Sequence, residues 1–153
     1  MQTRNFWSLM MILLAGFAFT SCNSTATTGD TDATSDQAAI EKAFDELKED
    51  YHSVMAATFH PAEEDNLEPV KAQYAALATK ADVWNKADVP KSLQEKGLDK
   101  SLELLAKESK EIGDLIEKGA TDEEIKAAIF ALHDRFHEIQ GKCDHEEDHG
   151  HEH

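Results

Sequence analysis

The stretch GATDEEIKAAIFALHDRFHEIQG, residues 119–141, decides the fold of this chain. Thr121 and Glu124 have the spacing of a capping box, which begins a helix, and Gly119 has the position of a glycine that ends the preceding helix. Apolar residues then recur every three or four positions, at Ile125, Ile129, Leu132, Phe136 and Ile139. This period predicts an amphipathic helix over about residues 121–141 that buries one face.

Three earlier stretches show the same period and predict helices over about residues 36–59, 68–85 and 92–118. Proline separates them. His60-Pro61 predicts the end of the first helix, Pro69 suits the first turn of the second, and Asp88-Val89-Pro90 separates the second from the third. Short connections favour antiparallel neighbours. The sequence therefore predicts an all-α fold, an up-down-up-down antiparallel four-helix bundle over residues 37–142.

The N-terminal segment has the pattern of a signal peptide. Arg4 precedes an apolar run over about residues 6–19, which is too short to span a membrane. The run ends in Phe19-Thr20-Ser21-Cys22, which resembles a bacterial lipobox. That resemblance implies a lipoprotein signal peptide over residues 1–21, an acylated Cys22 and a place in the bacterial cell envelope. Asn23 favours the outer membrane over the inner one, with the domain in the periplasm or at the cell surface. The alternative is an ordinary secretory signal cut near Ala18 or Ser21.

The segment after Cys22 is rich in Ser, Thr, Asp and Gly and has no apolar residue larger than Ala before the first predicted helix. Such a segment cannot bury enough surface to offset the entropy lost on ordering. Residues 22–36 are therefore predicted to be a disordered tether between the lipid anchor and the folded domain.

The charge of the chain favours cations as ligands. It has 31 acidic and 15 basic residues, a formal net charge of −16, and removal of residues 1–21 would take away one more positive charge. An excess of this size opposes binding to nucleic acid and to anionic lipid surfaces. The membrane is expected to be a partner only through the lipid anchor.

Histidines gather near the C-terminus. His133 and His137 are one helical turn apart, about 6 Å, so both imidazoles can bind a single ion. They lie on the flank of the buried stripe, which favours partial burial with access to solvent. We expect this pair to form the tighter site, completed by His52 or by Cys143.

The last residues, CDHEEDHGHEH (143–153), alternate histidines with carboxylates. This composition predicts a disordered, polydentate chelator that collects metal with lower affinity, because a flexible tail loses entropy for each residue it fixes. Its ligands are Cys143, His145, His149, His151 and His153. Zinc or copper is expected first and nickel or cobalt next.

A second histidine cluster lies around the end of the first predicted helix. His60 is followed by Glu63, Glu64 and Asp65, which suggests a cation site in a loop, and His52 and Met55 lie one to two turns earlier. Helix capping and solvation explain these acids without a metal. Met55 is expected in the core rather than on copper.

The order and length of the predicted helices resemble the cytochrome b562 and cytochrome c′ type of bundle. The haem-attachment motif Cys-x-x-Cys-His is absent because Cys143 stands alone, so haem is not expected. His133-Asp-Arg-Phe-His137 is similar to the zinc-protease motif, but Asp134 replaces the required glutamate. A di-iron site lacks inward carboxylates on the second and third helices.

The sequence thus predicts a non-enzymatic, envelope-anchored protein that binds, buffers or senses a transition metal, with an envelope metal-transport protein as a partner. The alternative is a structural or partner-binding bundle with no metal role.

Replacement of the lipobox cysteine tests the predicted anchor. We expect Cys22→Ser to abolish membrane association and leave the helical domain folded, because the anchor and the domain are separate parts of the chain. Membrane fractionation and mass spectrometry of the acyl chain measure the first effect, and circular dichroism measures the second. A substituted protein that stays in the membrane fraction, with no acyl chain on the wild type, would contradict the prediction.

Overall fold

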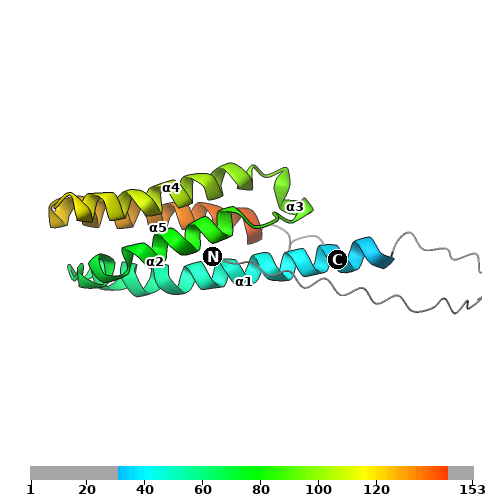
Figure 1. Cartoon of the computed structure of the whole chain (residues 1–153), viewed down its shortest axis with the longest axis horizontal. Helices are drawn as coiled ribbons and strands as arrows, with labels where there is room; N and C mark the ends of the chain where they lie inside the picture. The colour runs from blue at the N-terminus through cyan, green and yellow to red at the C-terminus, as the bar shows by residue number, and fades with distance from the viewer. Residues whose placement is uncertain (1–30, 145–153) are drawn as a thin grey trace, which may run out of the picture.

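The computed structural model describes residues 31–144, and within them the chain forms five helices and no strand. These are α1 (Thr31–Glu63), α2 (Glu68–Asn85), α3 (Lys91–Gln94), α4 (Leu98–Glu117) and α5 (Asp122–Asp144). Figure 1 shows α1, α2, α4 and α5 side by side, with the short α3 near one end and the first part of α1 projecting beyond the others. The predicted all-α class is confirmed. None of the helices in this part of the chain is long and apolar enough to cross a membrane.

The long helices pack in sequence order around one core. α1 contacts α2, α2 contacts α4, α4 contacts α5, and α5 contacts α1, the last being the least extensive of these four contacts. Four aromatic residues fill the middle, with ring centroids 5.6 to 6.2 Å apart: Phe44, Tyr51, Trp84 and Phe136. Each is at most 1% exposed. Burial of rings of this size is a major source of the stability of the domain.

One hydrogen bond joins two helices inside this core. The hydroxyl groups of Tyr51 on α1 and Ser109 on α4 lie 3.1 Å apart, and both side chains are fully buried. The indole Nε1 of Trp84 is also buried, and it has no partner among the described residues. The two hydroxyl groups in the middle of the core therefore satisfy each other.

The predicted starts of α5 and α2 and the predicted glycine end of α4 are confirmed. Thr121 and Glu124 form the reciprocal capping box: the Thr121 amide donates to the Glu124 carboxylate at 2.8 Å, and the Glu124 amide donates to the Thr121 hydroxyl at 3.3 Å. Gly119 has a φ of 74°, and its amide and that of Ala120 donate to the last carbonyls of α4. This is a Schellman motif, which requires a residue with positive φ. Pro69 lies in the first turn of α2.

α1 is longer at both ends than predicted. It begins at Thr31, so residues 31–36 of the predicted tether are helical. No Gly or Pro interrupts them, and acidic residues near a helix start are favourable. The side chains of residues 34–36 are exposed, and periodicity did not detect this turn. α1 also continues through Pro61 to Glu63, where a break was predicted. The helix extends only two residues further, and one of them, Ala62, is fully buried.

Two further boundaries were predicted wrongly. The helix expected over residues 92–118 is divided into α3 and α4, because Gly97 takes a left-handed conformation with a φ of 67°. α5 continues past Gly141, which keeps a negative φ, and ends at Asp144. Cys143 therefore belongs to the folded domain and not to a disordered tail that begins at residue 143.

Removal of the Tyr51 hydroxyl tests the buried hydrogen bond. We expect Tyr51→Phe to lower the free energy of unfolding by about 1–3 kcal/mol, because it leaves the Ser109 hydroxyl buried without its partner. The double variant Tyr51→Phe/Ser109→Ala should lose less than the sum of the two single variants. Urea unfolding of all four proteins measures this coupling, and strictly additive losses would contradict the prediction.

Candidate functional site

All four histidines among residues 31–144 lie along the contact between α1 and α5. We call this set the histidine seam: His52 and His60 on α1, and His133 and His137 on α5. Each ring contacts the ring of Phe59 or Phe136, which are buried side chains of the same two helices. The fold therefore brings together histidines that are more than 70 positions apart in the sequence.

The two histidines of α5 form a closely spaced pair. Their Nε2 atoms lie 3.1 Å apart, and their rings meet edge to face with centroids 4.4 Å apart. His133 is half-buried and His137 is exposed. This confirms the predicted position on the flank of the buried stripe, with both imidazoles on one side of the helix.

Two ring stacks connect α1 to α5 across the seam. Phe59 of α1 stacks on His133 of α5 at 3.6 Å between centroids and 2° between planes. Phe136 of α5 stacks on His52 of α1 at 5.3 Å and 15°. Each helix thus contributes one phenylalanine and one histidine. In each stack the phenylalanine ring covers one face of the imidazole ring, which restricts the histidine side chain.

The predicted loop site around His60 is not formed as expected. His60 and Glu63 lie in the last turn of α1 instead of a loop, with His60 Nδ1 2.9 Å from Glu63 Oε2. Asp65 instead pairs with Lys126 of α5. Within residues 31–144 no group of three or more His, Cys, Asp or Glu side chains is arranged to hold a metal ion. His60 and Glu63 form a pair and not a cluster.

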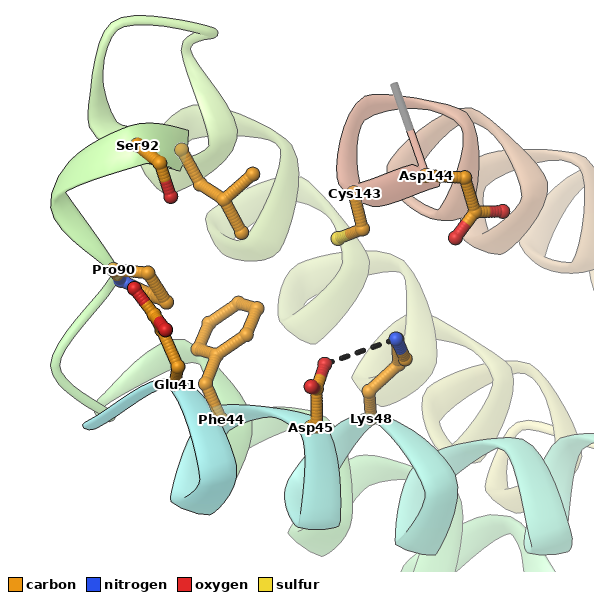
Figure 2. A pocket seen from close by; sticks show the side chains of 9 residues that line it. Glu41, Phe44, Asp45, Lys48, Pro90, Ser92, Cys143 and Asp144 are labelled. Atoms are coloured by element: carbon orange, nitrogen blue, oxygen red, sulfur yellow. Dashed lines mark hydrogen bonds and ion pairs between the residues drawn. The ribbon is translucent and has the colours of Figure 1, made fainter. Parts of the chain in front are cut away.

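Cys143 was expected to complete the pair on α5, and the structure places it elsewhere. Its thiol lines a pocket of about 350 Å³ between the first part of α1, α3 and the end of α5. Figure 2 shows the thiol on the side of the pocket opposite the ion pair of Asp45 and Lys48 on α1. The other lining residues are Glu41, Phe44, Pro90, Ser92, Leu93 and Asp144. Burial raises the pKa of the Cys143 thiol, which keeps it protonated and lowers its value as a ligand.

The surroundings of His133 favour its neutral form. Burial is the largest cause that lowers its pKa, the charge of His137 acts in the same direction, and the carboxylates of Asp134 and Glu63 oppose both. An imidazole binds metal only when neutral. His133 is therefore ready to act as a ligand near neutral pH.

The sequence did not indicate that two residues of α1, Phe59 and Glu63, lie near the histidine pair of α5. Phe59 supplies the surface on which His133 stacks, and Glu63 holds His60. The spacing of three between His60 and Glu63 was visible, but it places both on one helix face only if α1 continues through Pro61. The predicted ligands His145, His149, His151 and His153, and Cys22, lie outside the described residues.

The lowered pKa of His133 predicts a pH effect on stability. Its folded-state pKa is below the ordinary value of about 6.5, so the unfolded chain binds the proton more readily. The stability of the fold should therefore fall as pH falls through about 6.5. We expect His133→Phe, which keeps a ring stacked on Phe59, to lose less stability than wild type between pH 7.5 and 5.5.

Urea unfolding at both pH values, with a chelator present, measures this difference. The exposed His52→Ala variant is a control for loss of a histidine from the seam. Equal losses for wild type and His133→Phe would contradict the prediction.

Comparisons of the chain with protein-family models, curated proteins and solved structures gave no match. The resemblances to a lipoprotein signal and to a cytochrome b562 or c′ type of bundle therefore stay predictions.

Proposed function

We propose that this protein is an envelope-anchored lipoprotein that binds a transition metal through His133 and His137, and so buffers or senses it. The observation that carries this proposal is the separation of 3.1 Å between the two Nε2 atoms. Zinc binds imidazole nitrogen at about 2.0–2.1 Å, so an ion bound to both atoms would make an angle of about 100° between the two bonds. Such an angle lies close to both tetrahedral and octahedral values.

The pair is held in place before a metal arrives. Leu132 and Phe136, each of which directly precedes one of the two histidines, are each 1% exposed, so α5 cannot rotate without removing them from the core. The stack on Phe59 restricts His133 further. Ligands that are already ordered lose little entropy on binding, and this favours higher affinity than a flexible chain with the same ligands.

The metals that fit this pair are those that prefer nitrogen ligands. Imidazole suits zinc, copper and nickel, with cobalt close to them, whereas magnesium and calcium prefer oxygen. Haem is not part of the proposal. The net charge of −16 adds a general attraction for cations around the site.

The proposed arrangement of the whole chain has four parts. The signal peptide at residues 1–21 and the acylated Cys22 anchor the protein, and the tether ends where α1 begins at Thr31. The long helices then form an up-down-up-down bundle, which the contacts of α1 with α2 and α5, and of α4 with the same two, support. Residues 145–153 form a lower-affinity collector that raises the metal concentration near the bundle, from which an envelope transport protein could receive it.

A structural role without metal is the second candidate. The observation in its favour is that both His133 and His52 stack on phenylalanine rings, which is a packing role in itself. Metal titration of histidine variants separates the two candidates. Substitution of a ligand weakens metal binding, whereas substitution of a histidine that only packs leaves metal binding unchanged.

We expect the double variant His133→Ala/His137→Ala to lose the tightest zinc or copper binding by more than about 100-fold, since loss of even one outer-shell partner costs about 10- to 100-fold. Deletion of residues 145–153 should remove only weaker binding. Isothermal titration of both proteins and wild type measures the ranking. A matched control is Lys107→Ala/Glu111→Ala, an exposed pair with the same spacing on α4.

The reverse ranking would contradict the proposal. If the deletion removes the tightest binding and the double variant keeps it, the pair on α5 is a packing feature. Circular dichroism with a chelator should show unchanged helix content in every variant, because the core forms without metal.

A further inference from the structure

The last turn of α1 lies beside the histidine pair of α5. Phe59 is the point of contact: its ring stacks on His133 at 3.6 Å and meets the ring of His60 edge to face at 5.6 Å. Two imidazoles from different helices therefore lie against the same phenyl ring. Charges on His60 and Glu63 also influence the pKa of His133, as expected for groups that are close in space.

The contact between His60 and Glu63 has the form found around metal-binding histidines. His60 Nδ1 is 2.9 Å from Glu63 Oε2, so a proton on Nδ1 is donated to the carboxylate and Nε2 keeps its lone pair. Glu63 thus selects the tautomer that can bind metal through Nε2. In the comparable pair on the same helix, His52 Nδ1 and Glu49 Oε2 are 3.8 Å apart, too far for a hydrogen bond.

The His60 side chain can move without disturbing the core. The side chains of His60 and Glu63 are 68% and 49% exposed, whereas the ring of His52 is stacked on Phe136. An ion on His133 and His137 has coordination positions still open, since zinc takes four ligands in most protein sites. His60 does not form a group of three with the pair as it stands, but its ring contacts Phe59 and its charge acts on His133, so a change of its side-chain rotamer is what would bring it to the ion.

We propose that a transition metal bound to His133 and His137 takes His60 Nε2 as its third protein ligand, with Glu63 as the residue that orients His60. This proposal rests on the proposed function of the pair. Three histidines leave one position of a tetrahedral ion open, which suits a site that exchanges its metal with the C-terminal residues or with a transport protein.

Such an ion would link the first and last helices of the bundle. α1 and α5 share the least extensive of the contacts between the long helices, so a bond from each helix to one ion strengthens the weakest side of the fold. A metal that binds only the folded state raises its stability by mass action. Bound metal would then reduce the mobility of the end of α1. In a protein that senses metal, this change in α1 would be the structural signal.

Hydrogen–deuterium exchange of the full chain with and without zinc chloride tests this link. In wild type we expect zinc to slow exchange both around residues 133–137 and in the last turn of α1, residues 59–64. In His60→Ala zinc should still protect α5 but no longer the end of α1. The control Lys107→Ala/Glu111→Ala, an exposed pair on α4 outside the seam, should behave as wild type.

Zinc affinity gives the second readout. We expect His60→Ala to bind zinc about tenfold or more weakly, and Glu63→Gln to be weakened less, because the amide can still accept a hydrogen bond from Nδ1. Both side chains are exposed, so circular dichroism should confirm that the variants fold.

The outcomes separate this inference from the proposed function. If His60→Ala binds zinc as wild type does and zinc never protects the end of α1, while His133→Ala/His137→Ala loses zinc, the inference fails and the proposed function stands. If the double variant keeps the tightest zinc binding, both fail.

Discussion

The burial of Phe136 in the aromatic core is the constraint on which the functional geometry depends. Its ring contacts Tyr51 and Trp84 on one side of α5 and is 1% exposed. This fixes the rotation of α5 about its axis. Because residues one turn apart share a face, the same rotation places both His133 and His137 at the edge of the core. A small rotation would bury the pair or turn it fully into solvent.

The edge position is a compromise between order and access. A ligand in the core would lose contact with water and metal, and a ligand on a free surface would be disordered. His133 is held by its stack on Phe59 and still has a nitrogen 3.1 Å from that of His137, which is exposed. The same stack brings the end of α1 to the site. One phenylalanine therefore serves the packing of the seam and the assembly of the proposed ligand set.

The helix ends follow the same local rules but were not equally predictable. The capping box of Thr121 and Glu124 and the glycine at 119 acted as their spacing predicts, because these interactions involve only neighbouring residues. Pro61 did not end α1. The helix continues for two more residues, and the first of them, Ala62, is fully buried. Gly97, with its positive φ, divides the single helix that the apolar period predicted over residues 92–118. At Pro61 and Gly97, tertiary contacts or backbone conformation outweighed the signal in the sequence.

The sequence by itself determined the all-α class, the four amphipathic segments, the face that each buries and the position of His133 and His137 at the flank of that face. These follow from the 3.6-residue period and from caps, which depend on residues within one or two turns. Only the tertiary structure decided that Phe59 stacks on His133, that His60 reaches this side of the seam, that His52 stacks on Phe136 and that Cys143 lies in a separate pocket. Such contacts join residues dozens of positions apart, and they depend on how all the long helices pack at once, which no local pattern encodes.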